Sequence, residues 1–174
     1  MSTAEPSAPN QGAALLAMYD RALPQVYGYV CARVRNPVVA EDLTADTFLA
    51  AVQAIERGAV PDLTVAWLIA VARHKLVDHW RRQSREESGL RLVEDDQVED
   101  DGIDLHFEKA RAREVLDGLG AHHRSALTLR YLDGLSVPEV ADLLGRTVHA
   151  TEALLVRARH AFRTAYVEGR GDDI

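Results

Sequence analysis

Residues 134–162 have the types and spacing of groups that could hold a helix against DNA. Ser136 and Glu139 have the capping-box spacing, in which a hydroxyl and a carboxylate satisfy free amides of a helix's first turn. Gly145 stands where that short helix must end, and Thr147 can cap the helix that follows. This pattern predicts a DNA-binding helix-turn-helix, although an αα-hairpin that packs on a partner protein has the same pattern.

The chain offers little for catalysis or metal binding. It has no Gly-rich phosphate loop, no nucleophile elbow and no cluster of ligands at metal spacing. His122 and His123 are adjacent and point to different helix faces, and His74 with Asp78 gives only two ligands. Cys31 is the only cysteine, which excludes an internal disulfide. We therefore expect no enzyme, no bound metal and no cofactor.

Most of the negative charge lies in one segment of the 174 residues. The formal net charge is −7, and residues 83–107 hold nine Asp/Glu against two Lys/Arg. The flanking blocks 12–82 and 108–170 are nearly neutral. Because the acidic segment has no helical period and few large apolar residues, we expect it to be a flexible linker. Residues 1–12, rich in Pro, Ser and Ala, predict a disordered tail.

Apolar residues recur at three- and four-residue steps on both sides of the acidic segment, which predicts an all-α protein of two small helical domains. In the first, residues 13–82, we expect a helix that breaks or starts a new first turn near Leu23, because Pro24 disrupts a helix interior. We also expect a second helix over 37–55 and a third over 63–82. The inner face of the second helix would contain Val39, Leu43, Thr47/Phe48 and Val52. In the second domain, residues 108–170, the pattern predicts helices over 105–119, 122–133, 136–144 and 147–167.

The N-terminal residues and the hydropathy of the chain predict a cytoplasmic protein. The N-terminus lacks the basic and apolar regions of a signal peptide. No apolar run approaches the roughly 20 residues that span a membrane.

Three segments resemble the extracytoplasmic function (ECF, group IV) sigma factors of bacterial RNA polymerase, in the order that the family has them. They are VYGYVCARVRNPVVAEDLTADTFLAAVQAI at 26–55, AWLIAVARHKLVDHWRR at 66–82, and ALTLRYLDGLSVPEVADLLGRT from 126, followed by LVRAR ending at 159. The resemblance implies two helical domains like sigma regions 2 and 4. It also implies a protein that binds core polymerase through the β′ clamp and the β flap, and that recognises and melts promoter DNA.

The resemblance assigns the AEDLTADTF helix to the polymerase clamp. The residues that it implies for this contact are Glu41, Asp42, Thr44, Asp46 and Thr47. Their carboxylates would form an acidic face, which speeds and orients the encounter with a basic partner.

The resemblance assigns the end of the 63–82 helix and the preceding loop to the minus-ten promoter element. A melted strand needs cations for its phosphates and faces on which bases stack. Trp80 would supply such a face, and Asp62 lies in the loop. The implied set is Asp62, Arg73, His74, Lys75, His79, Trp80, Arg81 and Arg82.

The helix-turn-helix would then read the minus-thirty-five element. The implied set is Arg124, Arg146, Thr147, His149, Ala150, Glu152, Ala153 and Arg157. The chain departs from the family here, because Ala150-Thr-Glu-Ala-Leu154 replaces a common Thr-Val-Lys-Ser-Arg pattern. Glu152 can accept a hydrogen bond from cytosine, and Ala153 can meet a thymine methyl. Leu154 would either meet a methyl group or pack within the protein.

Two other classes of protein fit parts of the sequence. A helix-turn-helix regulator that binds DNA alone would use residues 13–82 for sensing or dimerisation. A purely protein-binding helical module would need none of the basic residues near Trp80. The resemblance further implies an anti-sigma factor as a partner.

Overall fold

The structure is a computed structural model that describes residues 10–89 and 108–169. All the secondary structure in these residues is helical, which confirms the predicted fold class. The chain divides into two compact units, Met1–Leu76 and Val77–Ile174, and the dividing point falls inside one helix. The predicted tail at 1–12 and the predicted linker lie largely outside the described residues.

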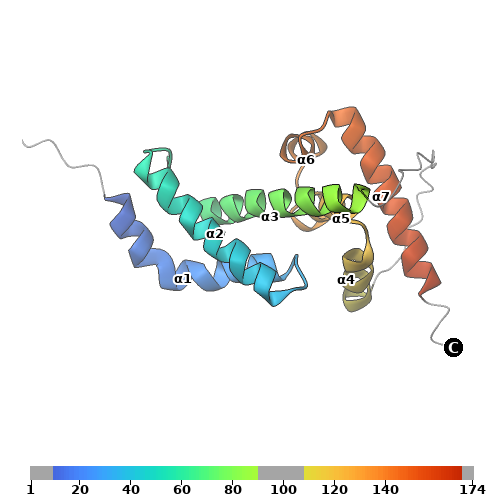
Figure 1. The fold of residues 1–174 in the computed structure, drawn as a ribbon, viewed down its shortest axis with the longest axis horizontal. Helices are drawn as coiled ribbons and strands as arrows, with labels where there is room; N and C mark the ends of the chain where they lie inside the picture. The colour runs from blue at the N-terminus through green and yellow to red at the C-terminus, as the bar shows by residue number, and fades with distance from the viewer. Residues whose placement is uncertain (1–9, 90–107, 170–174) are drawn as a thin grey trace, which may run out of the picture. The chain divides into compact units, whose positions relative to one another are not determined.

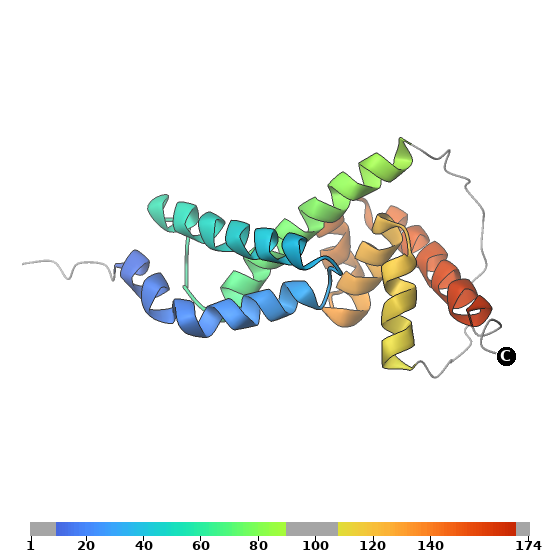
Figure 2. The same ribbon diagram turned by 60° about the horizontal axis from the view of Figure 1, so that its bottom comes forward.

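The first unit contains α1 (Gln11–Cys31), α2 (Pro37–Glu56) and the first turns of α3 (Val65–Ser88). Helices α1 and α2 lie side by side, as Figures 1 and 2 both show. Val26 and Val30 of α1 and Leu43 and Phe48 of α2 are buried. Val52, predicted to face inward, is 42% exposed.

The predicted break or new first turn near Leu23 is wrong, because α1 continues through Leu23 and Pro24. Figure 1 shows α1 bending rather than ending. A proline inside a helix removes one hydrogen bond and bends the backbone. Ala22 and Val26, on either side of Pro24, are completely buried. Their packing offsets the cost of the proline.

Helix α3 extends six residues beyond its predicted end at Arg82, to Ser88. The sequence prediction ended the helix at Arg82 because residues 83–107 are strongly acidic. Gln, Arg and Glu are nevertheless good helix formers. Residues 83–88 therefore continue the helix, and the last turns of α3 belong to the second unit.

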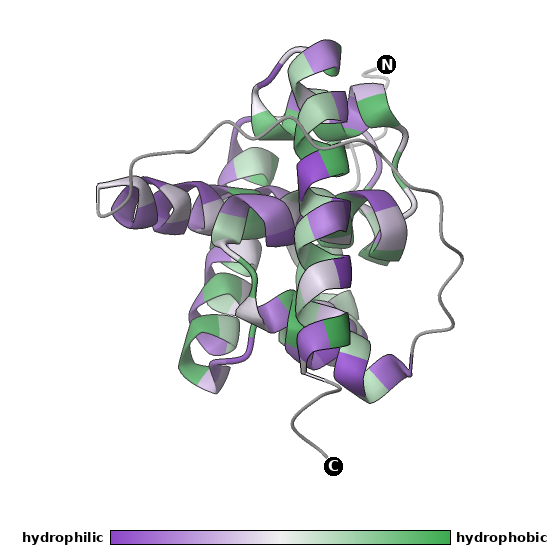
Figure 3. Cartoon of the chain, turned by 90° about the vertical axis from the view of Figure 1, so that its right-hand side faces the viewer, coloured by the Kyte–Doolittle hydropathy of each residue, from purple (hydrophilic) through white to green (hydrophobic). Residues whose placement is uncertain are grey.

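The rest of the second unit contains α4 (Lys109–Gly118), α5 (Ala121–Leu127), a π-helical turn η1 (Thr128–Leu132), α6 (Val137–Leu144) and α7 (Val148–Glu168). Helix α7 packs against α4, α5 and α6. A core of Ala126, Leu154 and Leu155 holds them together, with Val137 and Leu144 packed against it. Figure 3 shows hydrophilic and hydrophobic residues sharing each helix, as expected where one side is buried.

The predicted caps of the helix-turn-helix are confirmed. The Ser136 amide donates to a Glu139 carboxylate oxygen at 2.7 Å, and the Ser136 hydroxyl accepts from the Glu139 amide. Gly145 has a φ of 63°, the left-handed conformation that ends α6 without steric cost. The Thr147 hydroxyl accepts from the Ala150 amide at 3.1 Å and starts α7.

Candidate nucleic-acid and protein interfaces

The exposed face of α2 is acidic. Glu41, Asp42 and Asp46 all lie at the surface. Thr44 and Thr47 are buried instead, and their hydroxyls donate to the carbonyls of Ala40 and Leu43 at 2.7 Å. The two threonines therefore stabilise the helix from inside, and the carboxylates remain for a partner.

The same helix exposes large apolar residues that sequence reasoning missed. Val38 is 61% exposed and Leu49 is 57% exposed. A groove of about 420 Å³ between α1 and α2 is lined by Tyr19, Leu23 and Phe48 among others. Exposed apolar surface of this kind, next to charged groups, is typical of protein-binding faces. The sequence did carry a sign of this exposed apolar surface, because α2 has more apolar residues than one buried face needs.

The basic residues of α3 differ in exposure. His74 and Arg82 are exposed, whereas Arg73, Lys75, His79 and Arg81 are partly buried. Asp62, in the loop before the helix, is exposed. Trp80 is 1% exposed, so its ring belongs to the core and offers no open face on which a base could stack.

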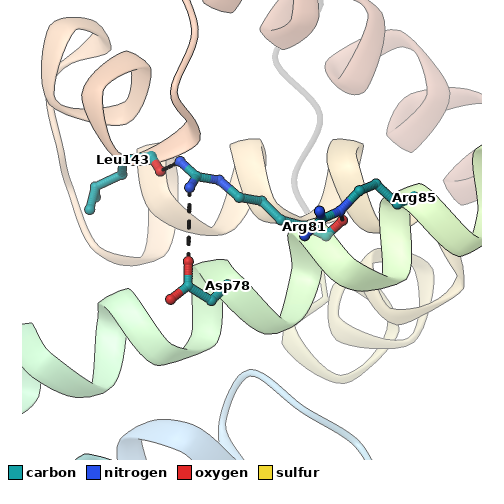
Figure 4. Close-up of polar contacts among 4 residues, drawn as sticks. All are labelled: Asp78, Arg81, Arg85 and Leu143. Carbon is teal, nitrogen blue, oxygen red and sulfur yellow. Dashed lines mark hydrogen bonds and ion pairs between the residues drawn. The ribbon is translucent and has the colours of Figure 1, made fainter. Parts of the chain in front are cut away.

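The end of α3 makes polar contacts with α5 and α6 inside the second unit. The Arg81 guanidinium donates to the backbone carbonyl of Leu143 and lies 3.8 Å from the carboxylate of Asp78 (Figure 4). Gln83 accepts a hydrogen bond from Arg124 at 2.9 Å. A Glu87 carboxylate oxygen accepts from the Ala121 amide, also at 2.9 Å. Two of the predicted DNA-binding arginines are thus engaged by the protein.

The first turns of α7 present a strip of exposed side chains. Arg146, Thr147, His149 and Glu152 are exposed, and Ala150, Ala153 and Arg157 are partly so. Val156, one turn beyond Glu152, lies on the same side and was missed, because an apolar residue in a helix gives no sign of facing outward.

Thr151 and Leu154 are buried, at 0% and 1% exposure. Leu154, the residue that replaces the arginine common in the family, therefore packs within the protein and is not free to touch a base. Of the residues that depart from the family pattern, Thr151 and Leu154 face the core, and Glu152 is exposed in the middle of the strip.

Half-buried histidines lie near the ends of α3 and α5. The rings of His122 and His123 stand 4.2 Å apart. Burial, together with the charges of His122 and Arg157, lowers the pKa of His123 to about 4. Burial also lowers the pKa values of His122 and His79, helped by Arg146 near the first and by Arg82 and Arg124 near the second. The unit therefore folds best with these imidazoles neutral.

Within the described ranges, no three His, Cys, Asp or Glu residues come close enough to hold a metal ion. None of the described helices combines the length and the apolar character needed to cross a membrane.

Replacing Leu154 by arginine tests its place in the core. An arginine there would bury an unpaired charge, so Leu154→Arg should lower the free energy of unfolding by about 3 kcal/mol or more. Urea unfolding measures this. Glu152→Arg, at an exposed position on the same helix, is the matched control and should change stability by less than about 0.5 kcal/mol. Equal stabilities of the two variants would contradict the buried position of Leu154.

The lowered pKa of His123 predicts that the folded protein is less stable at acidic pH. The pKa of His123 is near 6.5 in the unfolded chain and about 4 in the folded chain. Between these values the unfolded state binds more protons, so the stabilising effect is complete above pH 6.5 and is lost as the pH falls toward 4. The melting temperature should therefore drop between pH 7 and pH 5, and His123→Gln should reduce the drop. The exposed His160→Gln should not, and an identical pH profile for all three proteins would refute the assignment.

Comparison with known proteins identifies the family. Residues 18–86 match the model for sigma-70 region 2, and residues 109–162 match the model for sigma-70 region 4. The sigma factor BldN of Streptomyces coelicolor is 33% identical over 81% of this chain and 56% of its own length. The sigma factor SigC of Mycobacterium tuberculosis is 31% identical over 89% of this chain and 84% of its own length.

A solved structure has the same fold. The sigma factor RpoE from Bartonella quintana, in complex with the anti-sigma factor NepR, matches with a TM-score of 0.53 and 21% identity. The match covers 91% of this chain and 97% of that protein. With both sigma regions present in order, and relatives of the same kind along most of its length, this chain belongs to the ECF sigma factors of the sigma-70 family.

Proposed function

We propose that this sigma factor brings RNA polymerase to promoters through one protein-binding and two DNA-binding surfaces. The observation that carries this proposal is the exposed strip on the first turns of α7, directly after the glycine turn. In a helix-turn-helix, this part of the second helix enters the major groove. The minus-thirty-five element is the DNA that it would read.

The outer face of α2 binds the clamp of the polymerase β′ subunit, and the second unit binds the β flap. Glu41, Asp42 and Asp46 supply charge on α2, and Val38 and Leu49 supply apolar contact area. Charged groups set the rate and orientation of association, and apolar surface removed from water adds binding free energy. Thr44 and Thr47 contribute only through the stability of the helix.

The basic side of α3 holds the minus-ten element. Lys75 and Arg82 are seven residues apart, so they lie on the same face of the helix and can follow one strand of phosphates. Further positive charge on this helix would come from Arg73, His74, His79 and Arg81. Asp62, in the loop before α3, would contact a base. Trp80 acts here by fixing the helix rather than by stacking on a base.

The strip on α7 combines one carboxylate with small apolar groups. A carboxylate only accepts hydrogen bonds, and in the major groove the amino groups of cytosine and adenine donate them. Cytosine is favoured because adenine also presents N7, an acceptor, beside its amino group. Arg124, Arg146 and Arg157 anchor phosphates, and His149, Ala150 and Ala153 lie near the bases.

An anti-sigma factor is a further partner, and the apolar groove between α1 and α2 is a surface that it could cover. The related RpoE was solved in complex with such a protein. Because sigma factors act on the polymerase, we place the protein in the cytoplasm, without catalytic chemistry of its own. A match to sigma region 2 over residues 18–86 makes a stand-alone DNA-binding regulator the weaker alternative.

Removing cations from α3 should separate DNA melting from polymerase binding. The double variant Lys75→Ala/Arg82→Ala should lower promoter opening roughly tenfold, since it removes two phosphate contacts. Permanganate reactivity of promoter thymines measures opening, and co-purification with core enzyme measures assembly, which should be unchanged. Arg21→Ala, on α1, is the control. Normal opening by the double variant would exclude these two residues from the minus-ten contact.

Glu152 should set the base preference at one position of the minus-thirty-five element. Glu152→Gln should shift the preference from cytosine toward adenine, because an amide pairs with both N6 and N7 of adenine, and the discrimination should be about 1–3 kcal/mol. Selection from randomised duplexes by the polymerase holoenzyme measures it. Glu168→Gln, at the far end of α7, should leave the preferred sequence unchanged. The same preferred sequence from the Glu152 variant would contradict the proposed role.

A further inference from the structure

The π-helical turn η1 exposes a tyrosine that contacts α7. In η1 the amide of Asp133 donates to the carbonyl of Thr128, five residues earlier, at 3.0 Å. Thr128 and Leu129 are buried, whereas Tyr131 is 55% exposed. A π-helical turn is uncommon and often marks a functional site. This turn holds its first residues in the core and leaves Tyr131 for contacts at the surface.

Two arginines hold Tyr131 in place. The Arg159 guanidinium, on α7, donates to the Tyr131 hydroxyl oxygen at 3.2 Å. The guanidinium carbon of Arg130 lies 5.8 Å from the centre of the tyrosine ring, within the range of a cation–π contact. Arg130 is itself fixed, because it donates to the backbone carbonyl of Leu135 at 2.9 Å. A phenol hydroxyl that accepts one hydrogen bond can also donate one, so Tyr131 can bind an acceptor outside the protein.

Arg159 lies on the same side of α7 as the exposed strip. It follows Glu152 by seven residues, nearly two full turns, so the two side chains leave the helix in almost the same direction. Val156 lies between them on that side. The two residues are about 10 Å apart along the helix axis, and the major groove is about 12 Å wide. With Glu152 at the base edges, Arg159 and Tyr131 would lie at the border of the groove, where the phosphates of one strand run.

We propose that Tyr131 and Arg159, which we call the phosphate pair, bind a phosphate of the promoter backbone beside the bases that α7 reads. Tyr131 donates its hydroxyl hydrogen to a phosphate oxygen, and Arg159 supplies the positive charge. A guanidinium has five N–H groups, so Arg159 can donate to the hydroxyl and to the phosphate together. The pair extends the DNA-binding surface from α7 to η1. This proposal rests on the DNA-binding role of α7 given above.

The test removes the hydroxyl and the charge separately. Polymerase holoenzyme is bound to a promoter duplex that the native holoenzyme selects, in the cold so that the duplex stays closed, and fluorescence anisotropy measures affinity at several salt concentrations. Tyr131→Phe removes an uncharged donor, so it should weaken binding roughly fivefold without changing the dependence of log affinity on log salt. Arg159→Gln should weaken binding roughly tenfold and reduce the slope of that dependence by about one. Neither variant should change the preferred sequence, because phosphate contacts do not distinguish bases.

Two further variants serve as controls. Arg113→Gln, on the exposed side of α4, makes the same change of charge and should keep the native affinity and slope. Arg159→Lys keeps the charge without the planar fork, so it should restore the slope and only part of the affinity; if Arg159→Gln does not fold, this variant and Tyr131→Phe decide. Native affinity in the Tyr131 variant, or an unchanged slope in Arg159→Gln, overturns the phosphate pair. Weaker assembly with core polymerase at unchanged DNA affinity also overturns it, because the pair would then be a protein contact.

Promoter selection by the native holoenzyme separates this failure from that of the proposed function. If the native holoenzyme selects a promoter and both variants bind it equally well, only the phosphate pair is wrong. If the native holoenzyme selects no promoter, the proposed function is wrong, and the phosphate pair with it.

Discussion

The burial of one side of α7 is the constraint on which the rest of the second unit depends. Leu154 and Leu155 fill the core with Ala126, and Thr151 is buried on the same side. A helix that buries these positions has only one face left for solvent, and His149 and Glu152 lie on it. The core thus determines which residues can reach DNA, and it does so by packing alone.

A similar division applies to α2. Leu43, Thr47 and Phe48 fix its inner face, so the carboxylates and Leu49 face outward. Charge and apolar area then lie on one surface, which suits a partner that must be found quickly and held firmly. The two flanking blocks, 12–82 and 108–170, are nearly neutral, so the acidic face of α2 is a local feature and not part of a large net charge.

Arg81 and Glu87 show how side chains of one helix can satisfy the termini of two other helices. Helix termini carry unsatisfied polar groups that some other group must satisfy. Here the side chains of α3 satisfy one terminus of α5 and one of α6. Such bonds stabilise by only about 1 kcal/mol each.

The sequence by itself determined the features that depend on a few neighbouring residues. The Ser136 cap, the Gly145 turn and the periods of the helices follow from local hydrogen bonding and backbone sterics, and so they were predicted correctly. The sequence also determined the sigma-factor family, because ordered motifs carry it. Only the tertiary structure decided that Leu154 and Trp80 are buried and that Arg81 meets Leu143. These outcomes depend on contacts between segments far apart in the chain, and the period of a helix shows only that it has two faces, not which of its residues another helix covers.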